Sequence, residues 1–289
     1  MGIHPPGPHS TSLAILDKEY NVTHDVQTLL ATATDAAHLG GEILVKGFRE
    51  LRKEQIRMKG AGDYVTDLDH RSEEAIIRRI KQSFPDHHIH AEESGEEFSP
   101  SPYRWFIDPL DGTTNYVHGV TVFSVSIAAA VDGEMAVAVV LDPIHKEMFW
   151  AIKGQGAFLN TLPIWTSEKK TLGESYLASG FPWRSKEYLD LYLNSFREFF
   201  SDSSGVRRLG SAAIDLVYTA CGRFDGFWEM KLKPWDIAAG VLIVKEAGGL
   251  VSDFRGGQEF MKSGNLLAAN PFIFPKMLEV VKKHLGGVE

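Results

Sequence analysis

The sequence predicts a layered α and β fold, with an antiparallel first half and an alternating second half. Helical apolar spacing comes first, a run of strands joined by short turns follows, and strands then alternate with helices to the end. Elements with one apolar face bury that face by stacking in layers. The fold class is therefore mixed, α+β at first and α/β later. With 289 residues the chain can form one large domain or two closely packed lobes.

The composition is that of an ordinary globular protein, with 44% hydrophobic and 24% charged residues. A net charge of -8 argues against nucleic acid as a partner, because phosphate backbones bind to basic surfaces. No apolar run approaches the roughly 20 residues needed to span a bilayer. The N-terminus lacks the pattern of a secretory signal, so we expect a cytoplasmic protein without a membrane partner. The single cysteine, Cys221, is expected to be a small buried hydrophobe.

Two helices are predicted in the N-terminal region. Residues 1–20 are rich in Pro, His and Ser and predict a flexible tail. Apolar residues then recur at helical spacing from Val22 to Phe48, and Gly40-Gly41 within this stretch indicates tight packing against a neighbour. A second helix is expected after Thr66, whose hydroxyl can accept hydrogen bonds from free backbone N–H groups, and Pro85 ends it.

The middle of the chain is predicted to form strands. Asp132-Gly133 joins two of them in a hairpin, because glycine tolerates positive φ. Pro109 is expected to end the strand before it, because proline has no N–H to donate to a neighbouring strand. The strands expected in the first half span residues 88–91, 104–108, 122–131, 136–141 and 146–152, with a short one within 154–160.

The second half alternates strands and helices. The helix that begins at Trp235 is expected to close at Gly248-Gly249. Strands are predicted at residues 175–179, 206–209, 224–228, 250–253 and 266–269, and helices at 185–200, 212–220, 235–247 and 271–285.

Four acidic segments each stand at a predicted strand end or helix start. They are Asp63-x-Val65-Thr66-x-x-Asp69, Glu92-Glu93-Ser94-Gly95, Asp108-Pro109-Leu110-Asp111-Gly112-Thr113-Thr114-Asn115 and Trp235-Asp236-Ile237-Ala238-Ala239-Gly240. Each alone has an ordinary explanation: a turn, a solvated acidic loop or a helix start. Their joint occurrence favours a functional site.

The third segment alone carries ligands for a metal and for phosphate. A turn after Pro109 can bring Asp111 beside Asp108, with the Leu110 carbonyl between them. Two carboxylates and a carbonyl are the hard oxygen ligands that Mg²⁺ prefers. Gly112-Thr113-Thr114 then offers N–H groups and hydroxyls to phosphate oxygens.

These segments resemble the signatures of the inositol monophosphatase family, part of a larger group of lithium-sensitive, metal-dependent phosphatases. Residues 108–115 and 235–240 resemble its two main motifs, both intact, while Ala91 stands where glycine is common. The resemblance runs from about Asp25 to the C-terminus. It implies one catalytic domain over residues 21–289, with lobes of about 21–165 and 166–289. The implied fold is a five-layered α-β-α-β-α sandwich, with an antiparallel sheet in the N-terminal lobe and a mixed sheet in the C-terminal lobe. A homodimer is also implied.

The resemblance assigns roles to individual residues around two or three Mg²⁺ ions. The implied catalytic residues are Asp69, Thr113 and Glu92. Thr113 and Asp69 orient the attacking water, and Glu92 is also a metal ligand. The implied metal ligands are Glu92, Asp108, the carbonyl of Leu110, Asp111 and Asp236. The implied substrate-binding residues are Gly112, Thr113, Thr114, Ser179, Ala212, Glu229 and Asp236.

The expected reaction is hydrolysis of inositol-1-phosphate. Fructose-1,6-bisphosphatase, histidinol-phosphatase and 3′-phosphoadenosine 5′-phosphate phosphatase activities are alternatives on the same scaffold. A regulatory binding protein of transcription complexes is an alternative of another class, since bacterial relatives in the family are associated with such complexes. The presence of every expected carboxylate favours the enzyme.

Overall fold

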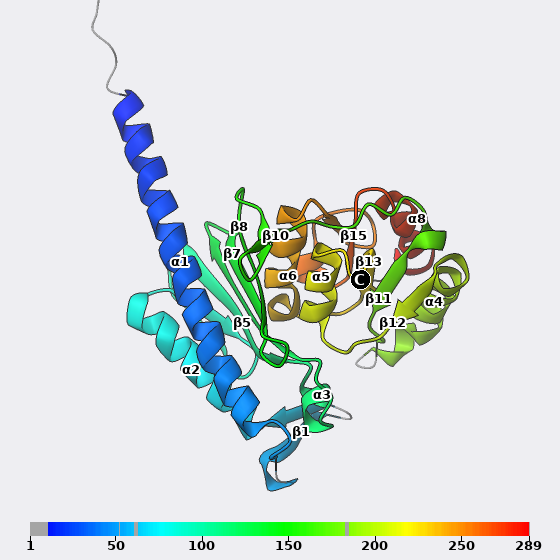
Figure 1. Cartoon of the computed structure of the whole chain (residues 1–289), viewed down its shortest axis with the longest axis horizontal. Helices are drawn as coiled ribbons and strands as arrows, with labels where there is room; N and C mark the ends of the chain where they lie inside the picture. Colours follow the sequence, from blue (N-terminus) through cyan, green and yellow to red (C-terminus); the bar gives the residue numbers. More distant parts are fainter. Residues whose placement is uncertain (1–10, 52, 61–62, 183–184, 289) are drawn as a thin grey trace, which may run out of the picture.

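Two sheets and three layers of helices are stacked in the computed structural model, which describes residues 11–288 apart from 52, 61, 62, 183 and 184. Figure 1 shows the order of the layers: α1 and α2, the first sheet, α5 and α6, the second sheet, and finally α4 with α8. This order confirms the expected α-β-α-β-α sandwich. The helices of these layers are α1 (Thr11–Gly47), α2 (Asp67–Ser83), α4 (Leu189–Asp202), α5 (Ala212–Ala220), α6 (Pro234–Glu246) and α8 (Phe274–Leu285).

The first sheet has eight strands in the order β10-β9-β8-β7-β6-β5-β3-β4. Neighbouring strands in this sheet are antiparallel except β3 and β5, which are parallel. The expectation of an antiparallel sheet is therefore wrong at this one pair. The cause is the order of the edge: β4 returns along the outer side of β3, and β5 then enters on the inner side. The strands are β3 (His88–Ala91), β4 (Gly95–Glu97), β5 (Tyr103–Asp111), β6 (Ser124–Val131), β7 (Glu134–Asp142), β8 (Glu147–Ile152), β9 (Ala157–Leu159) and β10 (Leu162–Ile164).

The second sheet has the order β12-β11-β13-β15-β14. The first three strands are parallel, and β15 is antiparallel to both β13 and β14, which confirms the expected mixed sheet. Because parallel strands point the same way, β12, β11 and β13 all end at one edge of the sheet. The strands are β11 (Tyr176–Ser179), β12 (Gly205–Arg207), β13 (Gly226–Glu229), β14 (Leu250–Ser252) and β15 (Leu266–Ala269).

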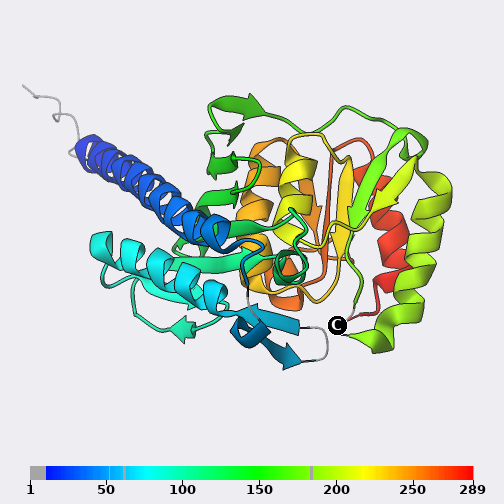
Figure 2. The ribbon, with the colours of Figure 1, turned by 60° about the horizontal axis from the view of Figure 1, so that its bottom comes forward.

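Helix α1 is longer at its N-terminus than the sequence predicted. It begins at Thr11, whereas the tail was expected to extend to residue 20; residues 1–10 lie outside the described part of the chain. The prolines of the expected tail end at Pro8, and residues 11–20 contain neither proline nor glycine, so they are compatible with a helix. Figures 1 and 2 show this N-terminal part of α1 extending beyond the sheet that the rest of the helix covers.

Glycines allow the helices to pack closely, as the sequence predicted at Gly40-Gly41. A Cβ added to Gly40 would lie 2.7 Å from Ser72 Oγ on α2. A Cβ added to Gly240 in α6 would lie 2.5 Å from Leu216 Cδ1 on α5. The last glycine of the 235–240 segment therefore sets the contact between the two central helices.

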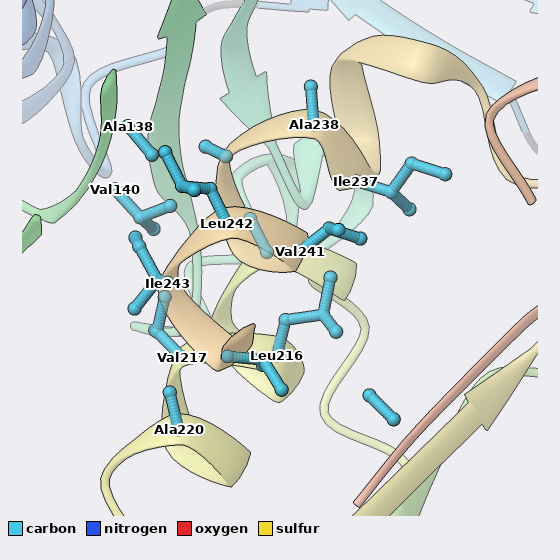
Figure 3. Packing of buried hydrophobic residues seen from close by; sticks show 14 of the residues in the cluster. Ala138, Val140, Leu216, Val217, Ala220, Ile237, Ala238, Val241, Leu242 and Ile243 are labelled. Carbon is cyan, nitrogen blue, oxygen red and sulfur yellow. The ribbon is translucent and has the colours of Figure 1, made fainter. Parts of the chain in front are cut away.

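The central helices join the two lobes in one apolar core. Figure 3 shows Ile243 and Leu242 of α6 and Val217 of α5 packed beside Ala138 and Val140 of β7. The same cluster contains residues of the second sheet, including Phe227 and Ala268. The position of one lobe against the other is thus fixed by packing on α5 and α6.

The structure differs from the sequence predictions mainly at short elements. Pro109 does not end its strand: β5 continues to Asp111, with an irregular register between Asp108 and Asp111 where proline needs no partner for its nitrogen. Besides β4 and β10, the sequence did not predict β1 (Ile56–Gly60), β2 (Asp63–Thr66), α3 (Thr113–Val117) or α7 (Phe260–Ser263). Cys221 is only partly buried. Across the described residues, no helix is both long and apolar enough to cross a membrane.

Candidate active site

A pocket of about 520 Å³ is lined by residues of both lobes. All four acidic segments contribute residues to it, although the first contributes Tyr64 and no carboxylate. The edge where β12, β11 and β13 end supplies its other side. The lining residues are Tyr64, Glu92, Asp108, Leu110, Asp111, Gly112, Thr113, Thr114, Asn115, Phe181, Lys186, Arg208, Leu209, Gly210, Ala212, Glu229, Leu232 and Asp236.

Three of the pocket carboxylates are oriented by hydrogen bonds from the backbone. Asp108 Oδ1 accepts a bond from the N–H of Leu110 at 2.9 Å, across the irregular end of β5. Asp111 Oδ2 accepts bonds from Ser211 Oγ at 2.6 Å and from the N–H of Ala213 at 2.7 Å. Asp236 Oδ2 accepts a bond from the N–H of Lys233 at 2.7 Å, at the start of α6. One oxygen of each carboxylate is thereby held, which fixes the direction of the group.

The pocket carboxylates repel one another. Burial raises the pKa of Asp108 well above its usual range, and the negative charges of Glu92, Asp111 and Asp236 raise it further. Burial also raises the pKa of Asp111, although hydrogen bonds from Ser211 and Ala213 lower it in part. Buried, mutually repelling carboxylates are stabilised by a cation placed among them.

The donor atoms fit a hard divalent cation. Within the part of the chain that the structure describes, no group of three His, Cys, Asp or Glu side chains lies close enough together to form a closed metal site. The carboxylates instead surround the pocket from β5, α6 and the turn after β3, close enough for Asp108 to experience the charge of the other three. Four carboxylates and the Leu110 carbonyl are all oxygen donors, which suits Mg²⁺ better than Zn²⁺.

Asp69 and Thr113 form a polar pair beneath the pocket. Thr66 caps α2, and Asp69 Oδ2 accepts bonds from the Thr66 N–H at 2.9 Å and its hydroxyl at 2.6 Å. The Thr113 hydroxyl lies 3.2 Å from Asp69 Oδ1 and 3.1 Å from the Leu110 carbonyl oxygen. Asp69 is fully buried, and this burial raises its pKa to about 6. Asp69 therefore reaches the pocket only through Thr113, which lines it.

Glu73 is a residue that the sequence analysis missed. It is 3% exposed and accepts bonds from the N–H groups of Glu93 at 2.8 Å and Ser94 at 2.7 Å. These bonds fix the turn that carries Glu92. Residues four apart share one face of a helix, so the spacing of Asp69 and Glu73 was the signal that could have identified it.

The turn after Asp111 has a shape that only glycine permits. Gly112 has a φ of 98°, and an added Cβ would lie 3.0 Å from the carbonyl oxygen of Val122. Asn115 then donates to the carbonyls of Val122 and Leu209, each at 2.8 Å, and so connects the two lobes. The backbone N–H groups of this turn are held at the pocket wall as a result.

The other side of the pocket contains two of the expected substrate-binding residues, Glu229 and Ala212. Glu229 and Ala212 line it, and a Cβ added to Gly180 would lie 1.8 Å from Glu229 Oε1, so the carboxylate lies against that glycine. Ser179 differs from the expectation because it is absent from the pocket lining and is 2% exposed. Its hydroxyl contacts the Tyr192 hydroxyl and, at 2.6 Å, the Trp228 carbonyl, which turns it toward the core.

Comparison with known proteins agrees with this arrangement. The model of the inositol monophosphatase family matches residues 25–285. The chain belongs to this family. Among curated relatives, the Nus factor SuhB of Pseudomonas aeruginosa is 43% identical over 265 residues, which cover 90% of this chain and 98% of SuhB.

Solved structures from the family share the fold. The extragenic suppressor protein SuhB of Bartonella henselae has a TM-score of 0.86 and 38% identity, covering 89% of this chain and 100% of that one. The inositol monophosphatase of Anabaena has a TM-score of 0.81 and 37% identity, covering 91% of this chain and 99% of that one. The family relationship therefore extends over nearly the whole length of those proteins.

Proposed function

We propose that the protein is a Mg²⁺-dependent phosphomonoesterase that hydrolyses inositol-1-phosphate to inositol and phosphate. The observation that carries the proposal is the single pocket in which four carboxylates, the Leu110 carbonyl and the Thr113 hydroxyl meet. Membership of the inositol monophosphatase family supports a phosphatase of this kind.

The proposed residues have three roles: some bind metal, some bind the phosphate, and some bind the hydroxyl groups of the substrate. Glu92, Asp108, Asp111, Asp236 and the Leu110 carbonyl would hold two or three Mg²⁺ ions. Bound Mg²⁺ supplies an acidified water and neutralises charge on phosphate oxygens.

The remaining residues act on the water, the phosphate and the polyol. The Thr113 hydroxyl, held by Asp69, accepts a hydrogen bond from the attacking water and directs it in line with the leaving oxygen. N–H groups at Gly112 and Thr113, with Thr114 beside them, bind the phosphate. Glu229 accepts hydrogen bonds from the hydroxyls of the polyol, next to Ala212.

Phosphate release from a substrate panel tests the reaction. The panel contains inositol-1-phosphate, fructose-1,6-bisphosphate, histidinol phosphate and 3′-phosphoadenosine 5′-phosphate, each with Mg²⁺ and with EDTA. The proposal predicts Mg²⁺-dependent turnover with the highest kcat/KM on inositol-1-phosphate, and inhibition by Li⁺. A higher kcat/KM on another member would replace the proposed substrate and keep the metal chemistry.

A second function is supported by the name of several relatives, Nus factor SuhB. It is a role as a binding partner in transcription complexes. This role would place the protein in the cytoplasm. We also propose that the protein forms a homodimer. The test is binding to purified bacterial RNA polymerase by biolayer interferometry, with wild type and Asp108→Asn. Equal binding of both proteins would support a partner role independent of catalysis, and no binding of either would exclude it.

A further inference from the structure

An aromatic contact joins the strand that leads to Glu92 to the helix that carries Asp236. His90 lies on β3, two residues before Glu92, and its ring centroid lies 5.2 Å from that of Trp235 in an edge-to-face arrangement. Trp235 is the second residue of α6 and directly precedes Asp236. The structure describes both rings, and neither belongs to the pocket lining. The contact can therefore act on the proposed metal site only through the neighbouring carboxylates.

The His90 ring is held in one orientation by its other neighbours. Arg104 Nη2 donates to His90 Nδ1 at 3.1 Å and to Glu96 Oε1 at 2.6 Å. Because a guanidinium has no acceptor atom, Nδ1 must accept, and the proton of the neutral ring is on Nε2. His90 also lies beside Phe106, its partner in the parallel pair of β3 and β5, with 5.7 Å between the ring centroids. The ring thus has a defined position against Trp235.

Trp235 is also attached to the first sheet through its backbone. Its carbonyl accepts a hydrogen bond from Ser126 Oγ at 3.3 Å, and Ser126 is the partner of Asp108 across β5 and β6. The first turn of a helix has N–H groups without partners inside the helix, so contacts outside the helix matter most there for its position. Trp235 therefore fixes the start of α6, and Asp236 with it, against β6 and β3.

We propose that His90 is a positioning residue of the metal site, because its ring holds Trp235 and so sets the position of the Asp236 carboxylate relative to that of Glu92. The proposal rests on the proposed Mg²⁺-dependent function and adds to it a residue that belongs to none of the four acidic segments. Mg²⁺ demands near-ideal octahedral geometry with oxygens at about 2.0–2.1 Å. A small displacement of one carboxylate relative to the other therefore weakens binding of the ion.

Two substitutions at His90 separate the ring from its hydrogen bond. His90→Phe keeps a ring against Trp235 and loses the acceptor for Arg104. His90→Asn loses the ring and keeps an acceptor, because the side-chain oxygen of Asn can replace Nδ1. The matched control is His88→Asn, the same change two residues earlier on the same face of β3, where Nε2 of His88 lies 2.8 Å from Glu96 Oε1.

Binding of Mn²⁺ to the metal-free proteins is the measurement, followed by electron paramagnetic resonance of the free ion. Mn²⁺ takes the same oxygen ligands as Mg²⁺. We expect His90→Asn to bind Mn²⁺ about tenfold more weakly than wild type, and His90→Phe and His88→Asn to stay within about threefold. Should circular dichroism show that His90→Asn does not fold, Trp235→Leu removes the other ring of the contact and must give the same tenfold loss.

Three results would overturn the proposal. Wild-type affinity in His90→Asn would show that the ring does not support the site. An equal loss of affinity in His88→Asn would show that any weakening of β3 has this effect. A tenfold loss in His90→Phe would assign the effect to the Arg104 hydrogen bond instead of the ring contact.

The binding measurement also separates this proposal from the phosphatase function. If wild type binds Mn²⁺ and releases no phosphate from inositol-1-phosphate, the phosphatase function fails, and the Mn²⁺ affinities still decide the role of His90. If wild type releases phosphate, the half-saturating Mg²⁺ concentration should rise about tenfold in His90→Asn and stay within about threefold in His88→Asn. A wild type that binds no Mn²⁺ would overturn both proposals.

Discussion

Substitution of Glu73 tests how the turn that carries Glu92 is held in place. Glu73→Ala removes the acceptor of the Glu93 and Ser94 N–H groups, which now lie at 2.8 and 2.7 Å from its carboxylate. Glu73→Gln keeps one acceptor oxygen and places an amide donor against the other N–H. Both changes should loosen the turn without touching a proposed metal ligand.

The magnitudes follow from the two hydrogen bonds. A partly buried donor left without a partner costs about 1–3 kcal/mol, so the loss of both acceptors in Glu73→Ala should lower the unfolding free energy by roughly 2–6 kcal/mol. Glu73→Gln should lose less, about 1–2 kcal/mol, because it removes one bond and also the buried charge, whose cost is evident from the raised pKa of Glu73. Loss of a residue that supports a metal ligand weakens metal binding by about 10–100-fold.

The assay pairs urea denaturation with Mg²⁺ titration of phosphatase activity. Glu74→Gln is the matched control, because Glu74 is the next residue on α2 and is exposed. We expect Glu74→Gln to behave as wild type, and Glu73→Ala to need about 10–100-fold more Mg²⁺ for half-maximal activity. Wild-type stability and an unchanged Mg²⁺ requirement in Glu73→Ala would refute this reasoning.

Three further predictions concern catalysis, packing and pH. Thr113→Ala should lower kcat by about 100-fold while Thr113→Ser, which keeps the hydroxyl beside Asp69, should stay within about tenfold; equal losses in steady-state kinetics would contradict the role of the hydroxyl. Gly240→Ala should lose about 1–3 kcal/mol in urea denaturation, because its methyl would overlap Leu216 Cδ1 at 2.5 Å, and an unchanged midpoint would be inconsistent with this contact. Burial raises the pKa of Asp215 well above its ordinary 3.8, because ionisation is penalised in the folded state but not in the unfolded chain. As pH rises above 3.8 the unfolded chain loses this proton first, so the folded protein loses stability until the pH has passed the folded pKa. In EDTA, the unfolding free energy of Asp215→Asn relative to wild type should therefore increase from about pH 4 to about pH 8, and a constant difference would argue against a buried charge there.

Long periodic elements were predictable from the sequence, whereas several short ones were not. Helix α5 was expected at 212–220 and lies at Ala212–Ala220, because its apolar spacing and the Ser211 cap are both local signals. The hairpin at Asp132-Gly133 was predicted for the same reason, and its φ values of 51° and 84° confirm it. Strands β4 and β10 were missed because Gly95–Glu97 contains no apolar residue and Leu162–Ile164 contains a proline, so neither shows a strand pattern. The parallel pairing of β3 with β5 depends on contacts between strands that no local pattern records.

The acidic segments predicted most of the pocket, because each carboxylate belongs to a recognisable motif. The structure brings Glu92, Asp108, Asp111 and Asp236 to one pocket and places Asp69 beneath Thr113. Glu73 was not found, because it belongs to none of these motifs and its partners lie about 20 residues away in the chain. Ser179 was expected in the pocket, yet the direction of its side chain depends on Tyr192 and Trp228, which sequence alone does not position.

The central claim is that the pocket carboxylates hold Mg²⁺ for hydrolysis of a phosphate ester. Phosphate release from inositol-1-phosphate by wild type and Asp108→Asn, both shown to be folded by circular dichroism, tests it most directly. We predict turnover by wild type that requires Mg²⁺ and stops in EDTA, and turnover by Asp108→Asn that is at least about 100-fold slower. A folded Asp108→Asn protein with wild-type activity, or wild-type turnover that persists in EDTA, would contradict the claim.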